Sequence, residues 1–347
     1  MVIYFSIFFI ICFLSFLECS ALSKKNSVLL FFFALLLIFI ASYFKPLYST
    51  TDDYAYYNHL VGYDDGVDFE LGYRFLINLL QVLNLDEYGF LTFIIVFISL
   101  VIKMLAGFNR IPYLILPLLV YTSHFFLYQE LTQIRSALAS SLTVLSIFLW
   151  LDKLKIVSLL IFLLALTFHK AVILFIPAFF ILNVDCKLNL VKLFFLILIS
   201  AFISFFMKKF ILWIGEGIIP DAVFNTYFLD EAGFSKAIGI LNPATVKYIF
   251  FSFVFVWFLS RIKDSTYLPL VNLYTFGTLW IIIFASFGTL AGRGAFFYTI
   301  YEMFLVSILM KAITDKLIRI VALASLMLVY TIILFINLDV KNVLVIP

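Results

Sequence analysis

Apolar segments long enough to cross a bilayer recur along the whole chain and are separated by short polar stretches. A helix needs roughly 20 mainly apolar residues to span the hydrocarbon core of a membrane. By length and hydropathy, the pattern predicts about twelve crossings. They cover residues 1–17, 28–44, 89–105, 113–130, 136–151, 156–168, 171–184, 188–206, 244–260, 268–287, 295–310 and 320–337. The first of these is read as a transmembrane helix rather than a cleaved signal peptide, because no Lys or Arg precedes it.

Residues 69–84 break this pattern, because their polar positions recur at helical spacing. The polar positions are Glu70, Arg74, Asn78 and Gln81, and the apolar remainder is Leu71, Phe75, Leu76, Leu79 and Leu80. This spacing predicts an amphipathic helix that lies on the membrane surface or dips into it. Glu70 and Arg74 are four residues apart, so a simple ion pair within this helix is the plainer reading of both.

The composition leaves lipid as the only plausible solvent for the chain. Hydrophobic residues make up 65% of the 347 positions and charged residues 12%, which is too little polar surface to cover a soluble core. No stretch is long and polar enough to form a soluble domain, so we expect an all-α polytopic protein with one membrane domain over residues 1–347. The sequence contains no phosphate-binding glycine loop, no Cys/His metal cluster and no nucleophile elbow, so we expect neither cofactor nor metal.

Basic residues are distributed unevenly between the two faces. If the loop with Lys24 and Lys25 is cytoplasmic, alternation of the crossings places 13 of the 23 basic residues inside but only 5 of the 20 acidic ones. This contrast is typical of the positive-inside rule. Both termini and the two longest loops, 45–88 and 207–243, then face outward. Any chemistry is therefore expected on the extracytoplasmic face.

Two positions suggest anion binding and proton transfer. Arg135 opens the predicted helix 136–151, and a cation at a helix N-terminus needs an anionic partner. A phosphate suits the planar guanidinium fork, although an arginine that snorkels to lipid headgroups is the alternative. His169 and Lys170 lie at a tight external turn. A histidine there can accept a proton near neutral pH, but histidines at helix ends are often only hydrogen-bonded.

Other unusual polar residues lie in the first external loop and near the end of the chain. The loop combines acids such as Asp53 with tyrosines, which suits sugar binding or, alternatively, an interfacial tyrosine belt. Arg293 lies between two glycines that permit a tight or unwound backbone. Glu302 is expected about two turns into the next helix. A buried carboxylate there needs a cavity or a cation, with Arg293 or Arg135 as candidates.

The order of these segments resembles the EpsG family, which includes Wzy-type polymerases of O-antigen and capsule repeat units. The resemblance covers residues 45–310 and rests on Asp53 to Tyr57, Phe69-Glu70-x-Gly72-Tyr73, Gln133-Ile134-Arg135, Phe168-His169-Lys170-Ala171, and Gly292-Arg293 ahead of Tyr298. It implies a glycosyltransferase-C-like fold in a bacterial inner membrane. It also implies a glycosyltransferase that joins undecaprenyl-diphosphate-linked oligosaccharides at the external face, with a chain-length regulator as a possible partner and no role for nucleic acid.

On this resemblance, Arg135 and Arg293 would hold the leaving diphosphate. His169, or an acid such as Asp53 or Glu70, would deprotonate the acceptor hydroxyl. Tyr57, Arg74, Gln133, Lys170, Tyr298 and Glu302 would contact the glycan or assist. Loop 207–243 is shorter than the corresponding loop of many family members, which bears on the size of the acceptor site.

Two other functions compete with this one. A flippase for lipid-linked oligosaccharide would also be a polytopic protein with buried polar residues, and Glu302 is the residue that favours it. The candidates gather at one face, however, as expected of an interfacial enzyme. An acyltransferase acting on the same glycans would need a more explicit histidine-centred signature than His169 provides.

Overall fold

The computed structural model describes residues 2–20, 23–50, 52–63, 69–184, 186–215, 224, 228 and 237–340. All regular structure in these residues is helical, which confirms the all-α class. The chain divides into two compact units: a first unit of Met1–Val172 and Val306–Pro347, and a second unit of Ile173–Leu305. Each unit is considered by itself, and the expected single membrane domain stays a prediction.

The first unit is built around α7. Its helices are α1 (Val2–Ser20), α2 (Lys24–Tyr43), α3 (Asp53–Leu60), α4 (Leu71–Val82), α5 (Tyr88–Gly107), α6 (Leu116–Val120), the π-helix η1 (Tyr121–Glu130), α7 (Ile134–Leu151), α8 (Lys155–Phe168), α16 (Lys316–Phe335) and the π-helix η3 (Ile336–Val340). The apolar stretch of α7 is 72% buried, against 44% for α1, α2 and α5. Reciprocal hydrogen bonds between Ser146 and Ser158 join α7 to α8. Small hydroxyl side chains at such contacts let helices approach closely.

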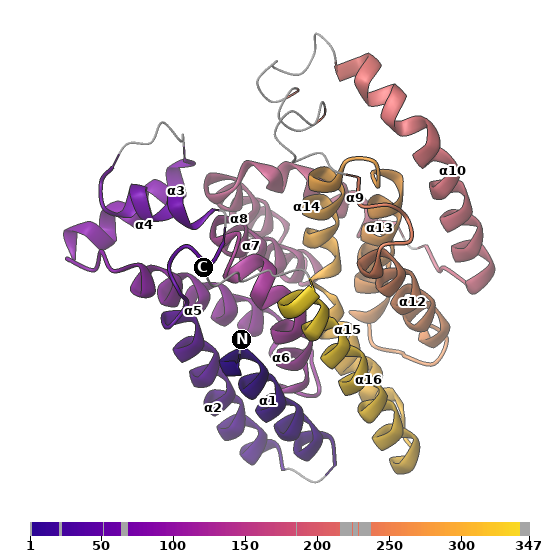
Figure 1. Ribbon diagram of the computed structural model, residues 1–347. Helices are drawn as coiled ribbons and strands as arrows, with labels where there is room; N and C mark the ends of the chain where they lie inside the picture. Colours follow the sequence, from indigo (N-terminus) through magenta and orange to yellow (C-terminus); the bar gives the residue numbers. More distant parts are fainter. Residues whose placement is uncertain are drawn as a thin grey trace. The chain divides into compact units, whose positions relative to one another are not determined.

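The amphipathic segment forms α4, as predicted. It buries Tyr73, Leu76, Ile77 and Leu80 against the first unit. The side chain of Gln81 donates to the backbone oxygen of Leu60 at 2.7 Å and so caps the C-terminal end of α3. The two short helices α3 and α4 therefore form one folded piece, which Figure 1 shows in purple beside α5.

The predicted crossing over 113–130 takes an irregular form. It consists of the five residues of α6 followed by the ten residues of η1. Glu130, the last residue of η1, is fully buried and forms an ion pair of 2.5 Å with Lys103 of α5. It also accepts a hydrogen bond from Ser99. Ser99 is 11 residues beyond Tyr88, so at 1.5 Å per residue this contact lies roughly 16 Å along α5 from the first residue of that helix.

The second unit contains shorter helices and one long one. It comprises the second half of the 3₁₀ helix η2 (Lys170–Phe175), α9 (Pro177–Ile181), α10 (Leu190–Gly215), α12 (Pro243–Phe258), α13 (Tyr267–Ile283), α14 (Gly288–Thr299) and the start of α15 (Glu302–Ala312). Asn242 caps α12 through a hydrogen bond from the Ala244 backbone at 2.9 Å, and Pro243 takes the first helical position. Both are standard signals for the start of a helix.

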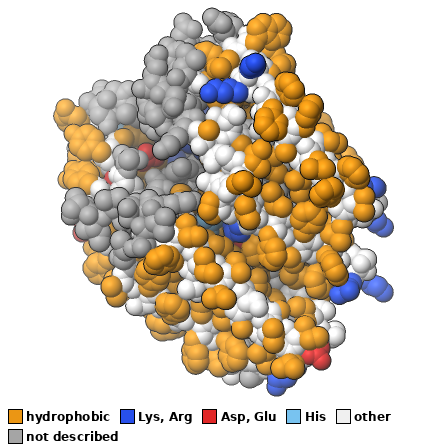
Figure 2. Space-filling model, turned by 45° about the vertical axis from the view of Figure 1, so that its right-hand side comes forward, with side chains coloured by type: hydrophobic (Ala, Val, Ile, Leu, Met, Phe, Trp, Pro, Cys, Tyr) orange, Lys and Arg blue, Asp and Glu red, His pale blue; other side chains and the backbone are white. Residues whose placement is uncertain are grey.

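Several helices of this protein are suited to a bilayer. Six of the described helices are long and apolar enough to cross it, or seven if α14 and α15, which meet at a bend of 42°, form one broken crossing. Four shorter apolar helices cover Lys155–Phe168, Lys170–Ile181, Pro243–Phe258 and Tyr267–Ile283. Hydrophobic side chains cover much of the surface in Figure 2, with Lys and Arg mainly near its margin. The chain is thus a helical membrane protein, and the number of twelve crossings stays a prediction.

Candidate functional site

Glu70 joins three segments that are far apart in the sequence. It precedes α4, and its extended backbone (φ −66°, ψ 149°) directs it away from that helix. One carboxylate oxygen accepts a hydrogen bond from Nη1 of Arg135 at 2.6 Å. The other accepts from the backbone N–H of Lys170 at 3.1 Å and lies 3.4 Å from Nδ1 of His169. Glu70 therefore connects segments that are distant in the sequence, so its role is not limited to an ion pair with Arg74 within one helix.

Arg135 lies in the first turn of α7, as expected, and its side chain is held in place rather than extended. Its guanidinium lies over the rings of Phe69 and Tyr56, at 4.9 Å and 5.7 Å from the ring centres. The side chain is 21% exposed. Glu70 is the anion that offsets the unfavourable dipole at this helix end. Nη1 is used by Glu70, and Nε is buried without a hydrogen-bond partner among the described residues.

The surroundings of Glu70 keep its carboxyl ionised. Burial by itself raises the pKa of this group, but the contact with His169, the charge of Arg135 and the Lys170 backbone N–H together lower the pKa of Glu70 to about 2. A carboxylate beside Nδ1 favours the imidazole tautomer that carries its proton on Nδ1. In that tautomer Nε2 is the nitrogen that can accept a proton, as in carboxylate-oriented histidines of known active sites.

Gly72 allows α4 to approach α8 closely, and this approach places Glu70 beside His169. A Cβ atom on Gly72 would lie 2.6 Å from Oγ1 of Thr167 and 2.9 Å from its backbone oxygen. Thr167 belongs to α8 and precedes His169 by two residues. The glycine in the Phe69-Glu70-x-Gly72 pattern is therefore explained by helix packing.

Replacing Gly72 with alanine is expected to separate α4 from α8. The clash with a backbone oxygen cannot be relieved by a rotamer change, so we expect a loss of roughly 1–3 kcal/mol in stability. Thermal unfolding of the purified protein measures this loss. Adding Thr167→Ala removes only the clash with Oγ1, so recovery should be partial. Wild-type stability of Gly72→Ala alone would contradict this account.

Asp53 is placed differently from the other candidate base residues. It is completely buried and forms an ion pair with Lys45. It also accepts hydrogen bonds from Tyr88 at 2.7 Å and from the Thr50 backbone at 3.0 Å. Burial lowers the pKa of Lys45, and the charge of Asp53 opposes that shift. These contacts favour a structural role for Asp53 at the start of α3, and its role as a base stays a prediction.

The remaining candidate residues of the first unit differ in their exposure to solvent. Arg74 and Lys170 are exposed, whereas Tyr57 and Gln133 are half-buried. Gln133 takes the N-cap position of α7 without a side-chain capping bond. Tyr57 contacts the rings of Tyr48 and Tyr88. A direct role of these four residues in glycan binding stays a prediction.

Glu302 differs in position from its expected place inside a helix. It is the first residue of α15, at the break after α14, where an acidic side chain suits the helix dipole. It is fully buried, and its ion pair is with Lys247 at 3.2 Å, whereas the sequence suggested Arg293 or Arg135 as the cation. Tyr274 donates to its other oxygen at 2.7 Å. The expectation of a cationic partner is confirmed, but the partner proposed was wrong.

The pair of Lys247 and Glu302 is expected to act in folding. Lys247→Met leaves a buried carboxylate without its cation, which costs roughly 3–5 kcal/mol. The double variant Lys247→Met with Glu302→Gln removes both charges and keeps an acceptor for Tyr274. We expect little folded Lys247→Met protein in membranes and a clear recovery in the double variant, measured by size-exclusion chromatography in detergent. A folded double variant without activity would instead indicate a direct role of Glu302.

Arg293 lies inside a regular helix. The segment around it was expected to allow an unwound backbone, but Gly292 and Gly294 both belong to α14. A Cβ atom on Gly294 would lie 2.1 Å from Nε1 of Trp280, so this glycine serves packing of α14 against α13. Tyr298 is fully buried and donates to the Leu174 backbone at 2.8 Å. Arg293 itself is half-buried, and its role at the diphosphate stays a prediction.

Several residues that hold these sites together were not predicted from the sequence. Lys45 and Lys247 each neutralise a buried acid, and Phe69 and Tyr56 flank Arg135. A lysine inside or directly after an apolar run is a detectable signal, because a buried ammonium needs a partner. The aromatic neighbours of Arg135 carried no such signal.

A comparison with protein-family models matches residues 29–347 to the EpsG family. The chain belongs to the EpsG family. EpsG-type proteins are Wzy-like polymerases, so membership indicates a membrane polysaccharide polymerase, which agrees with the apolar helical fold. No curated protein and no solved structure matches the chain. The glycosyltransferase-C-like fold therefore stays a prediction.

Proposed function

We propose that this EpsG-family protein polymerises oligosaccharide repeats carried on undecaprenyl diphosphate at the extracytoplasmic face of a bacterial inner membrane. The observation that carries the proposal is the assembly of Arg135, Glu70 and His169. An anion-binding guanidinium and a carboxylate-oriented imidazole are the two groups that transfer of a glycan from a diphosphate to a hydroxyl requires.

Arg135 would bind the diphosphate of the donor. A guanidinium presents a planar set of donors that fits phosphate oxygens, and binding in a partly buried site strengthens the interaction. Glu70 uses one of these donors, so a phosphate would share the guanidinium with the carboxylate. Negative charge grows on the diphosphate as it leaves, and stabilisation of such charge is often the largest contribution to catalysis. Arg293 of the second unit is proposed as a second phosphate ligand.

His169 would act as the general base toward the acceptor. The acceptor hydroxyl attacks the anomeric carbon of the donor sugar, and a new glycosidic C–O bond forms. The C–O bond to the diphosphate breaks, and its electron pair leaves with undecaprenyl diphosphate. The hydroxyl proton passes to Nε2 of His169, while the Glu70 carboxylate stabilises the imidazolium through Nδ1.

Deletion of the gene tests the proposed function against its main rival. Loss of the polymerase should leave single repeats attached to their acceptor, because flipping and ligation remain intact. Loss of a flippase should leave no surface glycan at all. Gel electrophoresis of the surface polysaccharide separates the two outcomes, and the length and linkage of the product decide between O-antigen and capsule. Normal long polymer in the deletion strain would rule out the proposal, and a change in modal length alone would point to a regulator of chain length.

A further inference from the structure

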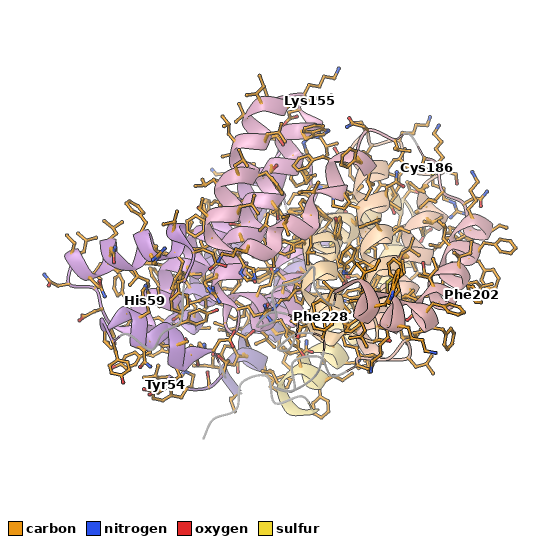
Figure 3. All side chains as sticks on the ribbon, turned by 90° about the horizontal axis from the view of Figure 1, so that it is seen from above. Tyr54, His59, Lys155, Cys186, Phe202 and Phe228 are labelled. Carbon is orange, nitrogen blue, oxygen red and sulfur yellow. The ribbon has the colours of Figure 1, made fainter. Side chains whose placement is uncertain are left out.

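Three tyrosines form an aromatic cluster at the start of α3 that the proposed chemistry does not use. Tyr48 and Tyr54 are 46% and 59% exposed, and Tyr57 is half-buried beneath them. The ring centre of Tyr48 lies 6.0 Å from that of Tyr54 and 6.1 Å from that of Tyr57. Figure 3 shows Tyr54 at the edge of the view, away from the centre of the helices. We call these three residues the tyrosine platform.

The backbone at Tyr48 is unusual for a tyrosine. Its φ of 63° lies in the left-handed region. Tyr48 is the third residue of a turn from Pro46 to Ser49, which the Ser49 N–H closes by donating to Pro46 at 3.3 Å. Glycine normally takes this position when φ is positive, and another residue there costs roughly 1–2 kcal/mol. Strained residues of this kind cluster at active sites, ligand-binding sites and switch regions.

A buried hydrogen-bond network adjoins the platform. The Asp53 carboxylate is bonded to Lys45, to the Thr50 backbone and to Tyr88. The ring of Tyr57 also lies 6.4 Å from that of Tyr88. On this arrangement the buried Asp53 has a structural role and takes no part in the chemical step. Rings held in place before binding lose little entropy when a ligand arrives.

The platform is close to the candidate site. Tyr56, which directly precedes Tyr57, has its ring 5.7 Å from the Arg135 guanidinium. Tyr54 and Tyr57 belong to the same short helix as Tyr56, and the eight residues of α3 extend over only about 12 Å. This helix therefore connects the surroundings of Arg135 to the platform.

We propose that Tyr48, Tyr54 and Tyr57 bind the sugar rings of the lipid-linked repeat unit by stacking, which rests on the proposed function and adds a glycan subsite to it. Pyranose rings present apolar C–H faces edged by hydroxyl groups. Tyrosine matches them with a rigid apolar ring and a polar hydroxyl, at a low cost in side-chain entropy. The competing occupant is the lipid headgroup layer, because tyrosines also gather at membrane interfaces.

Tyr48→Gly tests this proposal without endangering the fold, since glycine relieves the backbone strain. The probe is the cell's own repeat-unit oligosaccharide, freed from its lipid diphosphate by mild acid. Binding to the full chain in nanodiscs is measured by calorimetry. We expect Tyr48→Gly to melt no lower than wild type but to bind the glycan at least about five-fold more weakly, the loss of one stacked ring. Tyr54→Ala should weaken binding similarly.

Tyr63→Ala is the matched control, because Tyr63 is 62% exposed and lies just beyond the end of α3. It should bind the glycan like wild type. Unchanged binding in both Tyr48→Gly and Tyr54→Ala would overturn the platform and favour the lipid interface, as would a wild-type protein that does not bind the glycan. The proposed function is judged separately, by whether the deletion strain loses long polymer.

Discussion

Replacing Arg135 with lysine will abolish long polymer while the protein still inserts and folds. Lysine keeps the positive charge that Glu70 needs, so no buried carboxylate is left unpaired. It lacks the planar fork that binds a phosphate with two parallel hydrogen bonds. Loss of a preorganised donor to developing negative charge typically lowers the rate about 10²- to 10³-fold. The measurement is glycan length in cells and the rate of repeat transfer by protein in nanodiscs.

The chain offers a close control for this experiment. Arg110 also forms an ion pair with a carboxylate, that of Asp152, and its guanidinium lies 5.7 Å from the ring centre of Phe148. Arg110→Lys makes the same substitution in an ion pair that does not involve Glu70, and this variant should give normal polymer. If Arg135→Lys also makes full-length polymer at the wild-type rate, the guanidinium has no special part in the reaction. Wild-type polymer from Arg135→Ala would remove Arg135 from the site altogether.

The class of fold was predictable because it depends on hydropathy alone. A chain with 65% hydrophobic residues has few alternatives to a helical membrane protein. The helix around residues 69–84 was equally accessible, since its polar positions repeat at 3.6-residue spacing. The irregular helices could not be predicted in this way. The π-helix over Tyr121–Glu130 ends at the buried pair of Glu130 with Lys103, and no local sequence pattern predicts either feature.

The candidate site was predictable only in part, and the difference lies in sequence separation. The need of Arg135 for an anion follows from its place at a helix start. The identity of that anion does not, because Glu70 is 65 positions away and comes close through the packing of α4 against α8. The same holds for Glu302, whose cation is Lys247, 55 positions away. Local chemistry shows that a partner is needed, and tertiary structure selects it.

The dependence of activity on pH will identify the general base. Glu70 has a pKa of about 2, so it stays ionised at every pH at which the protein is handled and neither gains nor loses a proton near neutrality. Histidine is the side chain that changes charge between pH 5 and 8. If His169 accepts the proton, activity must fall once the pH is low enough to protonate the imidazole, because a protonated imidazole is no longer a base. The transfer rate measured from pH 8 to pH 4 reports this directly.

His169→Gln should lower the rate roughly 10²- to 10⁴-fold, the usual contribution of a positioned base, and the residual activity should lose the fall in acid. Glutamine keeps a polar group beside Glu70, so the ion pair of Glu70 with Arg135 is preserved and folding should be close to wild type. A wild-type rate that stays flat down to pH 4 would transfer the role to Glu70, whose carboxylate remains ionised there. That result would also reduce His169 to a hydrogen-bond partner, because an imidazole that is protonated without effect on the rate cannot be the group that takes the proton.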